Sequence, residues 1–500
     1  MNDKKDDKKD DQKDDQVLKP MYHEGHNPKS RRDFLAQGFL GLSTYTLAPS
    51  VLSVLSSPAH AAEECVAPAL TGMTPVIIVD LSGGGNIAGS NVMVGGKGGQ
   101  LDFLPNYQSL GLPPNFHPSM AGQINSEMGL VFHSDSGMLR GIQAVTQAST
   151  RANIEGMVFC TSTDDDTGNN ETNPIYWMNK AGARGALNQL AGTAQTKSGG
   201  KTSSPRESID PSLLPMRVAS PQDATNLASV GGLSTLFASG SPGKVEKILD
   251  SISRISDKKI SAMSRRSLPD QIKNIVSCGF SQTSNLLRTY TPALLDPTLD
   301  ANVVAVFPNI ANNGNQRKTA SIAKLVLDGF VGVGTIEMGG FDYHTGDRST
   351  GEARDLEVGD VVGRLMELAA RKQKDLVVIV LTDGGVAANS TVDNSVAGRG
   401  KFAWSGDSGQ RGATFMMVYK KDGKPQIRNA DQRQVGYFRP SSASVENTAL
   451  LTSNSVVNLS KALVANYLAL HGKEGNLAQV VGTDPFASNL DKYLVFNKLR

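Results

Sequence analysis

Carboxylate, imidazole and amide side chains recur in this sequence directly after short apolar runs, where the strands of a parallel sheet would end. Ligands of such sheets bind at the carboxyl ends of the strands. The candidate metal ligands are Asp80, Asp342, His344, Asp383 and Asp407. The further candidates for the same pocket are Asn86, His133, Asp135 and Asp164. Carboxylate oxygens and imidazole nitrogens suit Zn, Mn, Mg or Ca, so a divalent metal is expected.

The most specific pair of candidate ligands lies in the segment EMGGFDYHTGD. Two glycines follow an apolar run there, and Asp342 and His344 come next, two residues apart. Side chains two apart in an extended backbone point the same way, so both could reach one ion. The alternative for any single aspartate is that strand ends face water, where aspartate is common. His117 and His471 are expected to be structural.

A glycine-rich segment follows the first apolar run, in VIIVDLSGGGNIAGSNVMVGGKGG, residues 76–99. It contains Gly83-x-Gly85-x-x-Ala88, part of a dinucleotide-binding fingerprint. That fingerprint turns directly into a helix, whereas a glycine-broken sequence follows here, so nucleotide binding is not favoured. We interpret the glycines as a tight turn that brings Asp80 and Ser82 to the functional edge of the sheet.

The N-terminal region predicts export. Residues 1–30 open with a Lys/Asp mixture that cannot bury apolar surface, which predicts a disordered charged leader. Residues 31–61 begin with Arg31-Arg32, continue with a moderately apolar stretch and end on Ala59-His60-Ala61. This is typical of a twin-arginine signal peptide, with cleavage after Ala61. Polar residues interrupt the apolar stretch, so it predicts no transmembrane anchor, which needs about 20 mostly apolar residues.

The expected partner is therefore the twin-arginine translocase, and the expected location is periplasmic or secreted, without a stable membrane span. This route exports folded chains, often with a cofactor in place, which favours a metal. The net charge is +2, which gives no basic field for binding nucleic acid. The three cysteines, Cys65, Cys160 and Cys278, allow one disulfide or three free thiols.

Alternating helical and strand patterns predict the fold class. Apolar strands are expected at 74–80, 128–135, 155–160, 331–338, 374–383 and 411–420. Helices are expected at 137–150, 173–192, 318–330 and 350–373. This alternation predicts an α/β fold: an α/β/α sandwich on a mainly parallel sheet. Residues 62–500 would form a single domain, with a Ser/Gly/Lys/Pro loop at 193–212 and a helical insertion at about 212–297.

Five of these motifs together resemble an exported family. The twin-arginine signal, LSGGGN, FHPSM, EMGGFDYHTGD and SGDSGQRGATFMMVY are similar to segments of the domain-of-unknown-function 1501 (DUF1501) family. That family resembles the alkaline phosphatase and sulfatase superfamily in fold. The resemblance covers most of the mature chain and is strongest over 334–419. The resemblance implies an alkaline-phosphatase-like sandwich with one or two metal ions and a hydroxyl nucleophile. The candidate nucleophiles are Ser82 and Ser408.

The resemblance carries over to some positions and fails at others. Asp342 and His344 match the family's Asp-x-His, Asp383 stands at its acidic position after a strand, and Asp407 matches the acid of a Thr-Asp-His-Gly-like motif. The departures remove an acid or an imidazole, which are strong metal ligands. In this sequence Asn86 stands where the family often has Asp, and Ser408 stands where it often has His. Gly384 follows Asp383 where phosphatases and sulfatases commonly have His.

Two functions are therefore expected. The first is an exported metal-dependent hydrolase of a phosphate or sulfate ester. The second is a non-catalytic periplasmic protein that keeps the hydrolase fold and binds a ligand or an envelope partner, or serves in secretion assembly. Convergence of the carboxylates would favour the first; dispersed or ion-paired carboxylates would favour the second.

Overall fold

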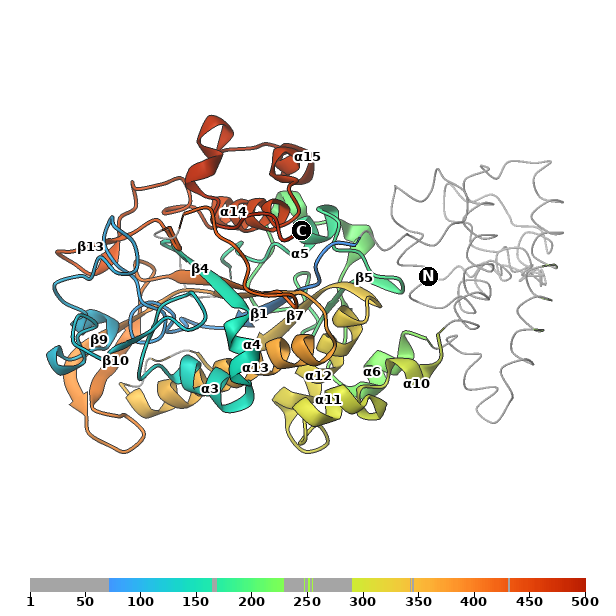
Figure 1. Cartoon of the computed structure of the whole chain (residues 1–500), viewed down its shortest axis with the longest axis horizontal. Helices are drawn as coiled ribbons and strands as arrows, with labels where there is room; N and C mark the ends of the chain where they lie inside the picture. Colours follow the sequence, from blue (N-terminus) through green and yellow to red (C-terminus); the bar gives the residue numbers. More distant parts are fainter. Residues whose placement is uncertain are drawn as a thin grey trace, which may run out of the picture. The chain divides into compact units, whose positions relative to one another are not determined.

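An eight-stranded sheet forms the centre of the structure (Figure 1). The computed structural model describes residues 72–163, 169–228, 247, 251, 254, 290–341, 343, 346–429 and 432–500. The strand order is β12-β4-β11-β8-β1-β7-β5-β6. In that order the strands are Gln434–Val435, Ile154–Cys160, Ala413–Tyr419, Leu376–Thr382, Val76–Leu81, Val331–Met338, Asn188–Gly192 and Met216–Arg217. Of these eight, β11 alone runs against its neighbours, which confirms the mainly parallel sheet.

The central strands are buried on both faces, which explains their continuous apolar sequences. In β1, Val76 and Ile78 contact one hydrophobic cluster, whereas Ile77 and Val79 contact the other. Successive side chains of a strand point to opposite faces, so a run without polar residues needs cover on both sides. The α/β class predicted from the sequence is confirmed.

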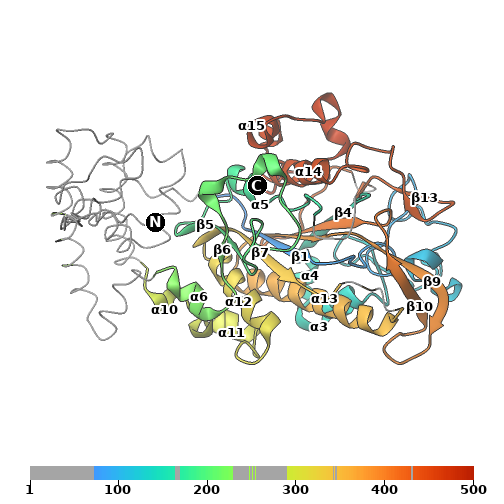
Figure 2. The ribbon, with the colours of Figure 1, turned by 180° about the vertical axis from the view of Figure 1, so that it is seen from behind.

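Helices supply that cover. The longer ones are α3 (Gly137–Val145), α12 (Gly314–Leu327), α13 (Arg348–Arg371) and α14 (Val456–Ala469). The shorter ones are α4 (Ala148–Ala152), α5 (Ile175–Lys180), α6 (Pro221–Asn226), α10 (Pro292–Leu295), α11 (Ala301–Val306) and α15 (Leu477–Val481). Figures 1 and 2 show α3, α12 and α13 on one face of the sheet and α5, α14 and α15 on the other.

Glycines let α3 and α13 approach closely. A Cβ atom on Gly359 would lie 2.0 Å from the carbonyl oxygen of Met138 and 2.9 Å from the Cα of Gly141. A Cβ atom on Gly363 would lie 2.6 Å from a methyl carbon of Val145. These separations leave no room for a side chain, so the backbones of the two helices pack directly on each other.

Short elements complete the fold. The hairpin of β9 (Val386–Asp393) and β10 (Lys401–Asp407) leaves β8 and returns toward β11. The remaining strand pairs are β2 (Ile124–Asn125) with β3 (Phe132–His133), and β13 (Phe438–Arg439) with β14 (Ser444–Val445). The 3₁₀ turns lie at Gln108–Leu110, Pro114–Phe116, Arg206–Ser208, Pro211–Leu213, Pro297–Leu299, Glu474–Asn476 and Ala487–Lys492.

Several predicted elements differ from the structure. The helix predicted over 173–192 ends at Lys180, and its second half forms β5, which pairs with β7. The strand predicted over 128–135 is reduced to β3, outside the main sheet. Most of the helical insertion predicted at about 212–297 lies outside the described residues, as do the leader, the signal peptide, Cys65 and Cys278. Cys160 is a buried free thiol at the end of β4.

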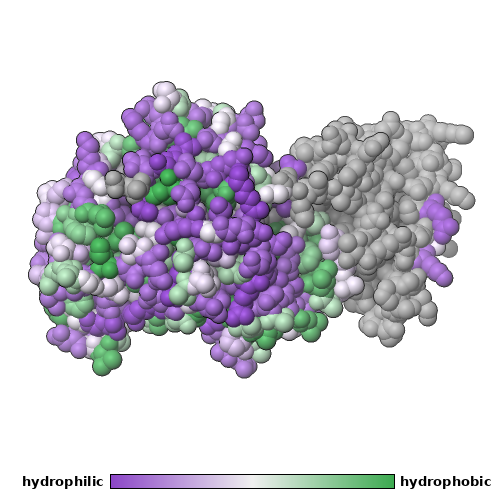
Figure 3. All heavy atoms as spheres, viewed as in Figure 1, coloured by the Kyte–Doolittle hydropathy of each residue, from purple (hydrophilic) through white to green (hydrophobic). Residues whose placement is uncertain are grey.

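The surface of the described part is largely polar. Figure 3 shows hydrophilic residues over most of the visible face, with smaller apolar groups between them. Among the helices that the structure describes, none is long and apolar enough to cross a membrane.

Candidate functional site

The carboxyl ends of β7, β1 and β8 meet at one edge of the sheet. Asp80 in β1 lies opposite Glu337 in β7 and Leu381 in β8. Ser82 and Asp383 each come directly after their strands, β1 and β8. The register therefore brings Asp80, Ser82 and Asp383 to the same edge, as the apolar runs predicted.

Asp80 is a buried carboxylate with one unsatisfied oxygen. Its Oδ2 accepts hydrogen bonds from the backbone nitrogens of Lys201 and Thr202, at 2.8 and 3.0 Å, and from Thr202 Oγ1 at 2.8 Å. Its Oδ1 is buried and has no hydrogen-bond partner among the described residues. Burial raises the pKa of Asp80 to about 7, against these hydrogen bonds, and the charge of Asp383 adds to the rise.

Asp383 is held by a residue from a distant loop. Its side chain is 1% exposed. Asn170 Nδ2 donates to Asp383 Oδ1 at 3.1 Å and also to the backbone carbonyl of Asp383. Asn170 is itself buried, so the loop after β4 is fixed against the end of β8.

Asp407 and Ser408 join the edge from the hairpin. Ser408 and Gly385 exchange two backbone hydrogen bonds, at 2.9 and 3.2 Å, so the end of β10 lies beside the loop after β8. A Cβ atom on Gly84 would lie 2.9 Å from Asp407 Oδ1 and 2.6 Å from the carbonyl oxygen of Gly385. The loop after β1 therefore packs against Asp407, and glycine is needed at position 84 for this approach.

Ser82 lies on the β7 side of the same edge. Its Oγ is 3.2 Å from Glu337 Oε1 and 3.2 Å from the carbonyl oxygen of Met338. Its carbonyl oxygen accepts from the backbone nitrogen of Phe341 at 3.2 Å. The chain that leaves β7 therefore runs past Ser82 as it enters the segment with the Asp-x-His pair.

Three predicted residues, Asp342, His344 and Asp164, lie outside the described residues. Tyr343 is described: its ring stacks on Trp404 with centroids 5.9 Å apart, and its hydroxyl donates to Asp355 Oδ1 at 3.4 Å. In the part of the chain that the structure describes, no group of three His, Cys, Asp or Glu side chains is placed to hold a metal ion.

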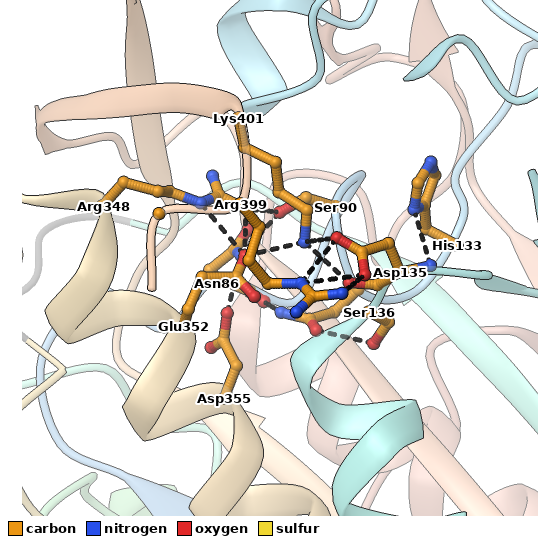
Figure 4. A network of polar contacts seen from close by, with 12 residues as sticks. Asn86, Ser90, His133, Asp135, Ser136, Arg348, Glu352, Asp355, Arg399 and Lys401 are labelled. Atoms are coloured by element: carbon orange, nitrogen blue, oxygen red, sulfur yellow. Dashed lines mark hydrogen bonds and ion pairs between the residues drawn. The ribbon is translucent and has the colours of Figure 1, made fainter. Parts of the chain in front are cut away.

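The remaining predicted residues, Asn86, His133 and Asp135, belong to a second network, drawn in Figure 4. Asn86 Nδ2 donates to Asp355 Oδ2 at 3.0 Å and to Ser90 Oγ at 2.7 Å. Burial, with the charge of Glu352, raises the pKa of Asp355 to about 7. Asn86 thus binds a carboxyl group of α13 rather than joining Asp80.

His133 has a structural role in this network. Its Nδ1 accepts from the backbone nitrogen of Asp135 at 3.1 Å, so its Nε2 donates to the carbonyl oxygen of Phe116 at 3.0 Å. Burial lowers the pKa of His133 to about 4. The ring is therefore neutral at physiological pH, and both nitrogens are already occupied.

Asp135 and Glu352 are paired with cations. Arg399 contacts the Asp135 carboxylate, and Lys401 Nζ lies 3.3 Å from Asp135 Oδ2 and 2.7 Å from Glu352 Oε1. Arg348 is fully buried, donates to Glu352 Oε1 at 2.8 Å and lies 4.1 Å above the Trp404 ring. These ion pairs join α13 to the β9–β10 hairpin and to the loop before α3. Because the carboxylates are paired, we assign this network a structural role.

Two residues of this edge, Asn170 and Thr202, were not predicted from the sequence. The signal at Thr202 was Gly199-Gly200, inside a segment interpreted as a linker. A Cβ atom on Gly200 would lie 2.0 Å from Asp80 Oδ2, so the glycine allows this loop to cover the carboxylate. The polar stretch around Asn170 carried no comparable signal, because Asn is common in any loop.

A pocket of about 520 Å³ lies at the opposite, amino-terminal edge of the sheet. Its lining includes the segments after α12, α13 and α14, with Asp328, Lys374 and His471. Helix C-termini carry partial negative charge, so a cation such as Lys374 suits this position after α13. This pocket and the gathered carboxylates are thus on different edges, and the carboxylates carry the candidate chemistry.

Comparison with known proteins adds no relative. No protein-family model matches the chain, and no curated protein matches it.

Proposed function

We propose that the protein is an exported, metal-dependent hydrolase of phosphate or sulfate esters. The observation that carries the proposal is the gathering of Asp80, Asp383 and Asp407 at one edge of the sheet, with Asp80 Oδ1 buried and without a hydrogen-bond partner among the described residues. A buried carboxylate is costly unless a cation or hydrogen bonds compensate it. The resemblance to the DUF1501 family and an alkaline-phosphatase-like fold is part of the same proposal.

By type, the donors at this edge suit a hard divalent cation, although the described carboxylates alone do not form a group of three placed to hold one. Asp80, Asp383 and Asp407 offer carboxylate oxygens, and Asp342 and His344 would complete the set. A bound divalent ion supplies Lewis-acid stabilisation of the charge that develops on the ester oxygens. The raised pKa of Asp80 fits this assignment, because a cation would restore its ionised form.

Ser82 is the better placed of the two candidate nucleophiles. Its hydroxyl hydrogen has two acceptors, the Glu337 carboxylate and the Met338 carbonyl, each 3.2 Å from Oγ. Glu337 would accept the proton as Ser82 Oγ bonds to the phosphorus or sulfur and the bridging P–O or S–O bond breaks to release the alcohol; water would then hydrolyse the ester formed on Ser82. Ser408 Oγ instead accepts a hydrogen bond from Arg411 Nη1 at 2.9 Å, which gives it a positioning role.

The test is elemental analysis of the exported protein together with hydrolysis of 4-nitrophenyl phosphate and 4-nitrophenyl sulfate. We expect stoichiometric Zn, Mn, Mg or Ca in the wild type, and loss of metal and activity in Asp80→Asn and Asp383→Asn. Asp375→Asn is the matched control, because Asp375 lies at the other edge, where Arg500 Nη2 is 2.7 Å from its carboxylate. Folded wild-type protein without metal would contradict the proposal.

One observation favours the non-catalytic alternative. The three histidines that the structure describes lie away from the gathered carboxylates: His133 in the α13 network, His117 at the carbonyl of Leu104, and His471 at the amino-terminal edge. None of the imidazoles in the described ranges would then serve the metal. A metal-free, inactive wild type would assign the chain to periplasmic ligand binding or envelope assembly.

A further inference from the structure

The pocket at the amino-terminal edge of the sheet has walls that the backbone holds in place. Its volume is about 520 Å³, within the range of sites for small molecules. Hydrogen bonds tie the segments around it together: the backbone nitrogen of Val377 donates to the carbonyl of Pro75, and that of Leu499 donates to the carbonyl of Leu470, each at 2.9 Å. The hollow is therefore set by the fold.

The pocket gathers more positive than negative side chains. Its five cations are Arg184, Lys374, Lys421, Lys498 and Arg500, and its two carboxylates are Asp328 and Asp375. Both carboxylates are already engaged by cations. Lys324 Nζ lies 2.7 Å from Asp328 Oδ2, and Arg500 Nη2 lies 2.7 Å from Asp375 Oδ2. The lining thus carries an excess of three positive side chains, and neither carboxylate is left to offset it.

Helix ends account for only part of this charge. The C-termini of α12, α13 and α14 at this edge carry about half a negative charge each, about one and a half together, which is less than the excess on the side chains. Arg184, Lys374 and Lys498 have no carboxylate within ion-pair distance in the part of the chain that the structure describes. Positive charge therefore remains for a ligand.

A neutral hydrogen-bond donor and apolar residues complete the lining. His471 Nε2 accepts from the backbone nitrogen of Thr74 at 3.3 Å, so the ring proton is on Nδ1, which has no hydrogen-bond partner among the described residues. Burial lowers the pKa of His471 to about 4, so the ring is neutral at physiological pH. The apolar residues of the lining are Met73, Pro75, Val326, Leu327, Leu470 and Leu499.

We infer that this pocket binds a small organic anion, with a carboxylate or phosphate head group held by Arg184, Lys374 and Lys498 and an apolar body against the rest of the lining. A cleft lined by one sign of charge raises the local concentration of the opposite ion. The Arg184 guanidinium can hold two oxygens of either head group, whereas each lysine acts as a point charge. Because the pocket is on the other edge of the sheet, this inference is independent of the proposed hydrolase.

Calorimetric titration of the intact protein with four ligands that share one apolar chain tests the site. Hexanoate and hexyl phosphate carry the two head groups, whereas hexanol and hexylammonium carry no negative charge. We expect at least one of the anions to bind about tenfold or more tightly than hexanol and hexylammonium at low salt, and to bind more weakly as salt is added. The tighter anion identifies the head group.

Removal of charge from the pocket gives the matched variants. Lys374→Gln with Lys498→Gln should weaken binding of the tighter anion about tenfold, with an unchanged melting temperature because both side chains are exposed. Arg184→Gln should act in the same direction. Lys97→Gln, exposed in the loop at 95–99 and outside this pocket, is the control and should leave the affinity unchanged.

Three results would overturn the inference: no anion binding by the wild type, equal affinity for hexanol, or unaltered anion affinity in the folded double variant. Metal content and ester hydrolysis are measured separately, so failure here leaves the proposed hydrolase standing. Anion binding that depends on Lys374 and Lys498 in a protein without metal would support the inference and reject the hydrolase.

Discussion

At the scale of single residues, Asp80 should control part of the pH dependence of stability. Its pKa is about 7 in the folded protein against 3.8 for an ordinary aspartate, so the folded state keeps a proton that the unfolded chain releases. The contribution of Asp80 to stability is therefore present below about pH 4 and is lost as pH rises to about 7. Asparagine does not titrate, so the free energy of unfolding of metal-free Asp80→Asn should not fall in this way. Relative to the metal-free wild type it should rise by up to about 4 kcal/mol as the pH goes from about 4 to about 7.

Urea unfolding of metal-free wild type and Asp80→Asn at about pH 4.5 and pH 8 measures this difference. The wild type alone would not show the contribution of Asp80, because burial lowers the pKa of His133 and His471 to about 4. Their contribution to stability increases with pH, whereas that of Asp80 decreases. Both histidines are present in both proteins, so their contribution cancels in the comparison. An unfolding free-energy difference that does not change with pH would show that Asp80 titrates normally.

Residue patterns in the sequence located part of the candidate site. Asp80, Ser82 and Asp383 were found because each follows an apolar run by no more than one residue, and parallel strands align such positions. Asn86, in the loop after the same run as Ser82, and His133, directly after its own run, were chosen by the same reasoning, yet the structure places them in the α13 network. What separates the two groups is their hydrogen-bond partners: Asn86 bonds Asp355, 269 residues away, and His133 bonds the carbonyl of Phe116, 17 residues away, and a strand-end pattern contains neither contact.

At the scale of elements, the contact between α3 and α13 should tolerate no added side chain on Gly359. Its Cβ atom would lie 2.0 Å from the carbonyl oxygen of Met138, a backbone atom that cannot move aside. Gly359→Ala should therefore destabilise the protein by about 3 kcal/mol or more, since α3 must shift. Gly314→Ala in α12 is the control: nothing lies within 4 Å of its Cβ position, and alanine should be neutral or stabilising by up to about 1 kcal/mol. Equal melting temperatures for the two variants would contradict this packing.

Continuous apolar runs predicted the central strands, because burial on both faces leaves no polar residue to interrupt them. The segment 188–192 lacks such a run and was predicted as the end of a glycine-interrupted helix, whereas β5 forms there. Pairing with β7 outweighed the local preference there. The antiparallel direction of β11 was also unpredictable, since an apolar run indicates burial and not direction. That direction is what brings the start of β11 to the edge that holds Asp383.

At the scale of the whole molecule, the chain should leave the cytoplasm only after it has folded. The candidate site takes residues from β1, β8, the hairpin and the loops at 170 and 202, so it exists only in the folded chain. A metal bound there before export fits the twin-arginine route. The double variant Arg31→Lys with Arg32→Lys keeps the charge of the proposed signal but removes the pair that the translocase would read. Precursor should accumulate in the cytoplasm, and the exported fraction should be lost.

Cell fractionation with mass analysis measures this outcome. The wild-type exported protein should begin at Ala62, as cleavage after Ala61 requires, and the retained double variant should keep its full N-terminus. The retained precursor also separates folding from export: if it carries the same metal content as the exported wild type, the site was loaded in the cytoplasm. Unchanged export of the double variant would show that another signal directs the chain. The argument that the metal binds before export would then no longer hold. The site itself would stand, because Asp80, Asp383 and Asp407 are brought together by the fold alone.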